Sequence, residues 1–165
     1  MSRYLLHHEA DDCIGCRACE IQCKASKALG PGPSPCQVVT VHTTPRTQFV
    51  FMPCFHCEDA WCLAACPTRA MQRRERDGIV FVEPSLCIGC RRCMAACPFG
   101  APQWDPVSRK VVKCDSCMDR LDVGLKPACV TTCVTGCLSF GEAGEMQRRR
   151  RERAAAAFGG SDPLR

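Results

Sequence analysis

The sequence has few of the residues that build an ordinary hydrophobic core. Leu, Ile, Val and Phe together make up about a fifth of the chain, and aromatic residues make up 6%, with one tyrosine and two tryptophans. A chain of 165 residues with this composition is at the limit of what apolar burial alone can stabilise. The length suits one or two small domains, so we expect something besides apolar burial to hold them together.

Long hydrophobic runs are also missing. The first ten residues, MSRYLLHHEA, contain no apolar segment of the kind found in a secretory signal, and there is no twin-arginine start. The longest uncharged stretches, residues 28–45 and 127–141, are interrupted by prolines, glycines or polar residues, which excludes membrane spans. We therefore expect a cytoplasmic protein without membrane insertion, whose thiols stay reduced and free to bind metal.

The sequence contains no motif of catalysis or nucleotide binding. It has no GxGxxG or P-loop in a strand–helix context, no Ser/His or paired-carboxylate arrangement, and no spare metal site with an open position. These absences predict a chain that is not itself an enzyme.

The net charge of +5 is concentrated near the C-terminus. The basic run there consists of Arg148, Arg149, Arg150, Arg151 and Arg153, offset by Glu152. Without this run the chain is close to neutral. We expect the run to lie on a solvated helix or to dock a protein partner, and we expect no nucleic acid to bind it.

Cysteine is abundant, at 18 residues or about 11% of the chain. All but two of these residues fall into four groups. The groups are Cys13, Cys16, Cys19, Cys23; Cys54, Cys57, Cys62, Cys66; Cys87, Cys90, Cys93, Cys97; and Cys114, Cys117, Cys129, Cys133. CIGCRACEIQC in the first group aligns without gaps with CIGCRRCMAAC in the third, and CLAACPT in the second resembles CVTTCVT in the fourth. This internal repeat indicates duplicated metal-binding units.

The CxxCxxC spacing favours iron–sulfur cubes. Three thiolates separated by two residues can wrap one tight loop around three irons, whereas the fourth cysteine begins a helix that leads away from that loop. In bacterial two-cluster ferredoxins this fourth cysteine ligates the other cluster. Gly15 and Gly89 let the backbone approach the inorganic sulfurs, and Pro67 and Pro98 turn the chain after the fourth cysteine.

The sequence therefore predicts four [4Fe-4S] clusters. Zinc is the alternative, but zinc sites use paired CxxC knuckles or Cys/His sets. None of the four histidines stands in place of a cysteine in any group.

The motifs resemble a known family. CIGCRACEIQCK, CFHCEDAWCLAACPTRAM, CIGCRRCMAACPFGAP and CDSCMDRLDVGLKPACVTTC are similar to the four motifs of electron-transfer subunits that serve molybdenum and tungsten pterin oxidoreductases. Members of this group serve dimethyl sulfoxide reductase, formate dehydrogenases, polysulfide reductase and tungsten aldehyde oxidoreductase. The resemblance covers residues 4–142.

The resemblance implies an α+β fold of two nested ferredoxin-like units, each with two [4Fe-4S] clusters, short strands and short helices. Residues 1–50 together with 108–145 would form the outer half, residues 51–107 the inner half, and residues 146–165 a basic helical or flexible tail. The resemblance also implies which cysteines share a cluster. The four sets are Cys13, Cys16, Cys19 with Cys133; Cys114, Cys117, Cys129 with Cys23; Cys54, Cys57, Cys62 with Cys97; and Cys87, Cys90, Cys93 with Cys66.

The implied function is the relay of single electrons between a Mo/W-pterin catalytic subunit, such as an aldehyde oxidoreductase or a formate dehydrogenase, and a second redox partner. That partner would be a flavin subunit, a hydrogenase or a ferredoxin. We expect the clusters to form a line with both ends near the surface, and such lines to be able to join end to end into a longer wire. Two alternatives are a free polyferredoxin carrier and a zinc-stabilised nucleic-acid adaptor.

Several residues besides these four groups are candidates for a role near the clusters. Cys36 is expected to be a loop thiol and Cys137 a small buried residue, with ligation or redox sensing as the alternative for both. His56 is expected to shield and pack, with a hydrogen bond to a cluster sulfur as the alternative. Three aromatic side chains are expected to exclude water from the clusters: Trp61, Phe99 and Trp104.

Short strands are expected between the motifs, at residues 38–41, 48–52, 79–82 and 110–112, because β-branched and aromatic residues gather there between turn signals. Residues 30–35, GPGPSP, are expected to form a stiff loop. Residues 142–158 favour a helix by propensity, and residues 159–165 are expected to fray.

Removal of iron is predicted to unfold most of the chain, because metal ligation supplies stability that the scarce apolar residues do not. Far-ultraviolet circular dichroism before and after anaerobic chelation measures this. An iron-free protein that keeps the spectrum of the loaded protein would contradict the prediction.

Overall fold

The computed structural model describes residues 3–159. The elements are, in chain order, β1 (Tyr4–His8), the 3-10 turn η1 (Ala10–Asp12), α1 (Ala18–Ser26), β2 (Gln37–Thr43), β3 (Arg46–Met52), α2 (Trp61–Ala64), β4 (Met71–Arg73), β5 (Val80–Val82), α3 (Arg92–Ala96), β6 (Gln103–Asp105), β7 (Lys110–Val112), α4 (Met118–Asp122), α5 (Ala128–Thr132), β8 (Leu138–Glu142) and α6 (Ala143–Phe158). In this part of the molecule the strands form four separate antiparallel pairs. The fold is α+β, as predicted.

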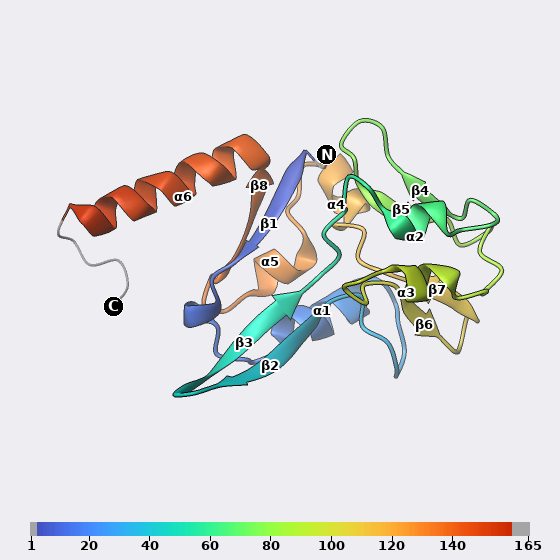
Figure 1. Cartoon of the computed structure of the whole chain (residues 1–165), viewed down its shortest axis with the longest axis horizontal. Helices are drawn as coiled ribbons and strands as arrows, with labels where there is room; N and C mark the ends of the chain where they lie inside the picture. The colour runs from blue at the N-terminus through green and yellow to red at the C-terminus, as the bar shows by residue number, and fades with distance from the viewer. Residues whose placement is uncertain (1–2, 160–165) are drawn as a thin grey trace.

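One lobe joins the beginning and the end of the described chain. β1 pairs with β8 from Tyr4 opposite Glu142 to His8 opposite Leu138. α1 packs against α5, and the β2–β3 hairpin covers the same core. Figure 1 shows the blue and orange segments side by side in this lobe. Its core consists of Cys19, Cys23, Cys36, Val38, Phe51, Cys129, Cys137 and Leu138. Five of these eight core residues are cysteines, so little apolar area is buried apart from thiols.

The other lobe is built from the middle of the chain. β4 pairs with β5, β6 pairs with β7, and α2 packs against α3. In Figure 1 these elements, coloured green to gold, lie together on one side of the molecule. The core of this lobe consists of Cys62, Met71, Val80, Cys93 and Val111.

Two hairpins span the predicted boundaries between the two halves. The boundary between residues 50 and 51 falls inside β3, which pairs with β2 along its whole length and places Phe51 in the core of the first lobe. The boundary between residues 107 and 108 falls inside the β6–β7 hairpin, and Val111 of β7 packs in the core of the second lobe. A hairpin folds as one unit, so the second lobe extends to the end of β7.

The expected strands are present, with small shifts at their ends. β2 and β3 are longer than predicted, β5 begins one residue later, and β7 has the predicted bounds. Residues 30–35 are irregular, as expected. The strands β1, β4, β6 and β8 were not predicted. Two of them have only three residues, and β1 and β8 are stabilised by a pairing across almost the whole chain, which local patterns do not show.

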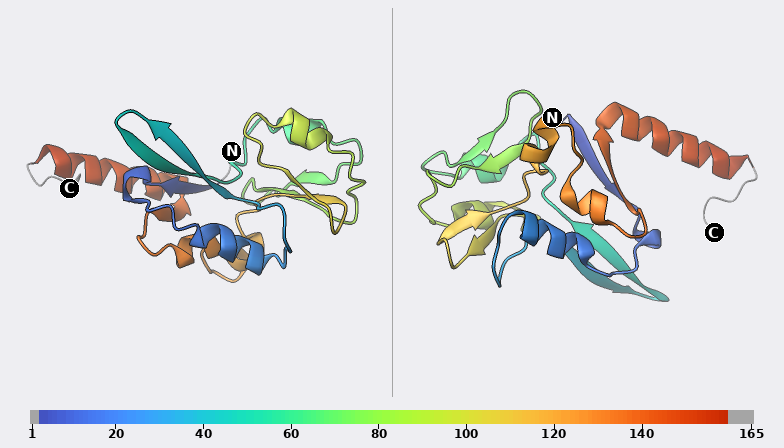
Figure 2. Two further views of the ribbon diagram at one scale, coloured as in Figure 1. Left: turned by 90° about the horizontal axis from the view of Figure 1, so that it is seen from below. Right: turned by 180° about the vertical axis from the view of Figure 1, so that it is seen from behind.

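The C-terminal helix α6 carries the basic run and projects away from the two lobes (Figure 2). Met146 is buried at 6% exposure and packs near Gly141 of β8, which attaches the first turn of α6 to the body. Arg149 is bonded to Glu145 within the helix at 2.6 Å, and Arg153 reaches Glu9 at 2.7 Å. The basic run is therefore on a solvated helix, and residues 160–165 of the predicted fraying segment lie outside the described residues. Among the residues that the structure describes, no helix is long and apolar enough to cross a bilayer.

The two CIGCR loops have matching backbone angles, as their repeated sequence suggests. Gly15 and Gly89 have φ of +67° and +73°, and the arginines two residues later, Arg17 and Arg91, have φ of +58° and +60°. A Cβ atom on Gly89 would lie 2.8 Å from the carbonyl oxygen of Arg109. Glycine is therefore required at this position both by the dihedral angle and by the space.

Gly89→Ala is expected to destabilise the loaded protein by roughly 1–2 kcal/mol from the left-handed dihedral, with a further cost from the contact with Arg109. Thermal unfolding and iron content of the purified protein measure this. Gly144→Ala, at a position of α6 where a Cβ meets nothing within 4 Å, is the matched control and should be neutral or slightly stabilising. Equal melting temperatures for the two variants would contradict the argument.

Candidate metal centres

The cysteines are all free thiols, and the fold gathers them in sets that differ from the sequence motifs. Site III is a cavity of about 330 Å³ whose lining includes Cys54, Cys57 and Cys62 from the second motif and Cys97 from the third. Cys97 is more than thirty residues away from the other three in sequence. The cavity therefore exists only because the two motifs cross.

Two smaller cavities of about 20 Å³ each repeat this pattern. Site IV is lined by Cys87, Cys90 and Cys93 together with Cys66 of the second motif. Site I is lined by Cys13, Cys16 and Cys19 together with Cys133 of the fourth motif, and by Cys137. In each case three thiols come from one loop and one comes from a different motif.

Site II consists of Cys114, Cys117, Cys129 and Cys23. Burial raises the pKa of Cys129, and the neighbouring thiols of Cys114, Cys117 and Cys23 raise it further. Sites I to IV are thus the four sets that the family resemblance assigns to one cluster each.

Crossed helix pairs explain why each set combines three thiols of one motif with one thiol of another. α1 packs against α5, and α2 packs against α3. Cys23 lies in α1 and Cys133 follows the last residue of α5, so each member of this pair carries one cysteine towards the loop of the other. Cys97 follows α3 in the same way, and Cys66 lies just beyond α2. The last cysteine of each motif thus lies in or just after a helix that packs against the helix of another motif.

The sites suit a group that brings its own positive charge. Burial raises the pKa of Cys19 and Cys93 to about 11 and that of Cys114 to about 12. At neutral pH these thiols would keep their protons in the absence of metal, and only a bound cation would displace them. Sets of four soft thiolates select iron–sulfur clusters or zinc, so the donor set fits the clusters that the spacing predicts.

A buried cation stands beside the largest of these cavities. Lys113 is 6% exposed and lines site III. Its Nζ donates hydrogen bonds to the carbonyl oxygen of Cys114, at 2.6 Å, and to that of Val80. The ammonium group lies between site II and site III. The sequence pattern did not single out this residue, since lysine before a CxxC motif carries no special signal.

His56 forms a structural link and does not face a cluster site with a free nitrogen. Its Nδ1 accepts from the backbone N–H of Val80 at 3.0 Å, and its Nε2 is 2.8 Å from the hydroxyl of Ser116. Burial lowers the pKa of His56 to about 3, so the ring is neutral. The residue ties the second motif to the fourth, and both ring nitrogens are used in doing so.

The aromatic residues divide into a shielding residue and residues at the rim. Trp104 packs against Gly89 and beneath the guanidinium of Arg91, whose Cζ is 4.0 Å from the ring centroid. Trp61 and Phe99 line site III but remain 64% and 49% exposed, with Phe99 in edge-on contact with Phe55. Trp104 therefore matches the shielding role predicted for it more closely than Trp61 and Phe99 do.

The two surplus cysteines each lie beside a cysteine that crosses between motifs. Cys36 belongs to a loop, as expected, but is buried at 2% exposure in the same cluster as Cys23, and its thiol donates to the carbonyl oxygen of Cys19 at 3.9 Å. Cys137 is buried, as expected, and its Sγ is 3.4 Å from the Sγ of Cys133.

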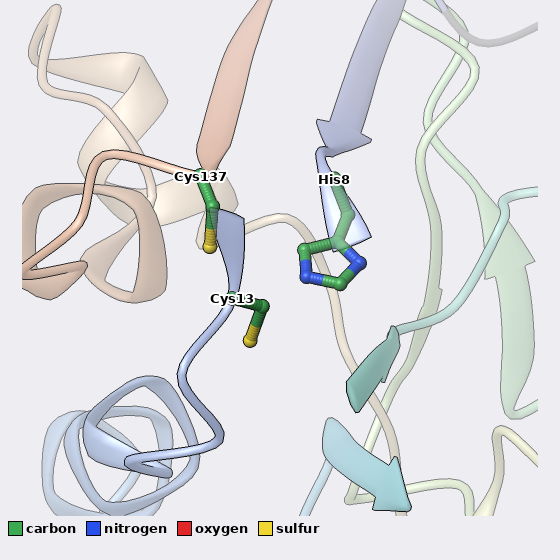
Figure 3. Close-up of side chains that lie close together, drawn as sticks. All are labelled: His8, Cys13 and Cys137. Atoms are coloured by element: carbon green, nitrogen blue, oxygen red, sulfur yellow. The ribbon is translucent and has the colours of Figure 1, made fainter. Parts of the chain in front are cut away.

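His8 was not identified from the sequence. β1 carries it to site I, where one ligand atom each from His8, Cys13 and Cys137 lie within 4.8 Å of one another (Figure 3). The buried Nε2 of His8 has no hydrogen-bond partner within the described residues. Only the β1–β8 pairing brings His8 and Cys137 together, so the sequence contains no local sign of this contact.

Known proteins share these features. A family described as "4Fe-4S dicluster domain" matches residues 45–143. The B subunit of the anaerobic dimethyl sulfoxide reductase of Escherichia coli (strain K12) is 36% identical over 168 residues, which cover 94% of this chain and 82% of that protein. The thiosulfate reductase electron transfer subunit PhsB of Salmonella typhi is 40% identical, covering 90% of this chain and 81% of that protein. The B subunit of the polysulfide reductase of Wolinella succinogenes is 38% identical, covering 85% and 76%.

These relatives decide between the functions that the sequence left open. They are subunits of oxidoreductase complexes, and one is described as an electron transfer subunit. The free carrier and the zinc-stabilised adaptor are therefore set aside. The chain thus belongs to the family of non-catalytic iron–sulfur electron-transfer subunits of dimethyl sulfoxide reductase- and formate dehydrogenase-type molybdopterin oxidoreductases, and it carries four [4Fe-4S] clusters.

Proposed function

We propose that each of sites I to IV holds one cluster through its four cysteines and that electrons pass along them in that order. The ligands would be Cys13, Cys16, Cys19 and Cys133 at site I; Cys23, Cys114, Cys117 and Cys129 at site II; Cys54, Cys57, Cys62 and Cys97 at site III; and Cys66, Cys87, Cys90 and Cys93 at site IV. The two lobes would be the two nested ferredoxin-like units, with sites I and II in one and sites III and IV in the other.

The observation that carries the order is the proximity of thiols from successive sites. Cys19 of site I adds to the effect of burial in raising the pKa of Cys129 of site II. Cys54 of site III acts in the same way on Cys114 of site II, and Cys62 of site III acts on Cys93 of site IV. The same neighbours meet in space: Cys19 and Cys129 share one buried cluster and Cys62 and Cys93 share the other. Lys113, which lines site III, is bonded to the carbonyl of Cys114, and together these contacts support a single line I–II–III–IV.

Both ends of this line have exposed loops. Cys16 of site I and Cys90 of site IV are exposed, and the isoleucines in the same loops, Ile14 and Ile88, are 63% and 67% exposed. An apolar side chain next to an accessible thiol suits a protein surface that a redox partner covers. One end would face the pterin catalytic subunit and the other a second redox partner.

The finer identity of the partners is also part of the proposal. The catalytic subunit would hold molybdenum or tungsten, as in a formate dehydrogenase or an aldehyde oxidoreductase, and the second partner would be a flavin subunit, a hydrogenase or a ferredoxin. Similar exposed loops at both ends leave room for end-to-end association of copies. We also propose a cytoplasmic location, a compartment in which the ligand thiols stay reduced. Identification of the proteins that copurify with this chain, with molybdenum and tungsten analysis, tests these assignments.

Lys113 would raise the midpoint potential of the clusters at sites II and III. A buried positive charge stabilises an added electron more than an exposed one, because little water screens it. The Lys113 ammonium lies between sites II and III, with both of its resolved hydrogen bonds made to backbone carbonyls. The clusters beside it would therefore accept electrons more readily than they would without it.

Cys97→Ser is expected to damage the cluster at site III, held by the second motif, and not the cluster at site IV, whose loop is in the same motif as Cys97. Loss of a middle site should also stop electron transfer between the partners while leaving the catalytic subunit active with an artificial dye. Electron paramagnetic resonance of the reduced complex, together with both assays, measures this. If the signal of site IV alone were lost, the exchange of ligands between motifs would be wrong.

Lys113→Met is expected to lower the midpoint potential of at least one middle cluster, since a buried positive charge is removed while the aliphatic volume is kept. A redox titration followed by electron paramagnetic resonance measures the shift. Lys126→Met is the control, because this lysine is exposed and its charge is screened by solvent. Equal potentials in the two variants would show that Lys113 has no tuning role.

A further inference from the structure

The turns after Cys66 and Cys133 are copies of one another. The thiol of Cys66 is 3.8 Å from the hydroxyl of Thr68, and the thiol of Cys133 is 3.8 Å from that of Thr135. The third residue after each cysteine donates its N–H to that cysteine's carbonyl oxygen, at 3.3 Å and 3.2 Å. These two residues, Arg69 and Gly136, have φ of +56° and +70°. The backbone after the two cysteines is therefore equivalent.

This equivalence aligns Cys137 with Ala70. Both residues follow their cysteine by four positions, and both are buried, at 5% and 2% exposure. In the inner lobe the position holds a methyl group, whereas in the outer lobe it holds a thiol whose Sγ is 3.4 Å from that of Cys133. Cys137 also lines site I together with the four cysteines assigned to it. The outer lobe thus has a fifth thiol where its counterpart has none.

We propose that Cys137 is a reserve ligand of the cluster at site I. In the exchange, the bond from iron to the Cys133 sulfur breaks and a bond from the same iron to the Cys137 sulfur forms. The proton of the Cys137 thiol moves to the departing Cys133 thiolate, so charge is conserved and no electron is transferred. The inference rests on the proposed assignment of Cys133 to site I.

Cys133 and Cys137 differ in exposure and in how firmly the backbone holds them, as an exchange of ligands between them requires. Cys133 is half-buried at an end of the relay and is followed by Val134, which is 78% exposed, where the inner lobe has Pro67. Without proline the turn after Cys133 is less constrained. Cys137 is protected from solvent and lies at the start of the β1–β8 pair, next to Leu138. The reserve thiol is therefore on the more firmly held of the two positions.

Besides the cysteines, His8 also places a possible ligand atom at site I. Its Nδ1 accepts from the backbone N–H of Phe51 at 3.3 Å, so the ring proton is on Nε2. A protonated nitrogen donates hydrogen bonds and does not bind iron. In Figure 3 the imidazole of His8 and the thiols of Cys13 and Cys137 converge on one space. His8 would then donate to a sulfur at site I, and the thiol of Cys137 would be the exchanging ligand.

The test compares matched alanine variants of the full chain, purified anaerobically with its clusters. Cys133→Ala is expected to keep about sixteen irons and to show no [3Fe-4S] signal in the oxidised protein, because Cys137 holds the fourth iron. The double variant Cys133→Ala/Cys137→Ala should lose that iron and show the signal. Cys66→Ala, in the equivalent turn without a spare thiol, should also show it. Iron analysis and electron paramagnetic resonance are the readouts.

A gain of function in the inner lobe provides an independent arm. Adding Ala70→Cys to the Cys66→Ala variant should restore the fourth iron at site IV and remove the [3Fe-4S] signal. If Cys133→Ala fails to fold, the comparison of Cys66→Ala with and without Ala70→Cys tests the inference. Restoration of the fourth iron supports the inference, and failure to restore it overturns the inference.

The remaining outcomes separate the inference from the ligand assignment. A [3Fe-4S] signal in Cys133→Ala as strong as in Cys66→Ala would overturn the reserve ligand while leaving the assignment intact. Such a result would mean that Cys137 only donates a hydrogen bond to Cys133. Full iron content in the double variant would also overturn the inference, because another group would then hold the iron. An unchanged cluster content in Cys66→Ala would instead show that the proposed ligand sets are wrong.

Discussion

The gathering of thiols from distant parts of the chain into buried sets is the constraint on which this fold depends. The four strand pairs are two-stranded, and pairs of that size are marginal in water by themselves. Four of the helices have only four or five residues, too few to be stable alone. Both lobes have cores made in large part of cysteine. The clusters therefore act as cross-links, and the polypeptide is ordered around them.

In the proposed assignment, the same cross-links arrange the clusters in a sequence. Because the last cysteine of each motif lies in or just after a helix that packs against the helix of another motif, two sets of thiols are held close together within each lobe. Lys113, which lines site III and is bonded to the carbonyl of Cys114, then joins the lobes, and His56 bonded to Ser116 adds to that junction. In that assignment, structural stability and the path of the electron would come from one set of bonds. Lys113 adds a charge at the junction without adding a ligand.

The two lobes are related by an internal repeat but are not equivalent. The inner lobe has proline after both of its crossing cysteines, Cys66 and Cys97, whereas the outer lobe has Lys24 and Val134 at these places. The outer lobe instead has an extra buried thiol beside each crossing cysteine, Cys36 beside Cys23 and Cys137 beside Cys133. It also has the attached helix α6. The repeat was therefore modified mainly in the lobe formed by the two ends of the chain.

The sequence by itself determined the number and type of the clusters, the repeat of the two CIGC loops and the short strands between the motifs, because ligand spacing and turn residues are local properties. Ligand sharing came from the family resemblance, since no spacing rule alone decides which loop a crossing cysteine reaches. Only the tertiary structure decided that β1 pairs with β8, that Lys113 lies between two sites, and that His8 and Cys137 both face site I. These contacts join residues from opposite ends of the chain or from different motifs. Their energy comes from strand pairing and burial between segments that are far apart in the sequence.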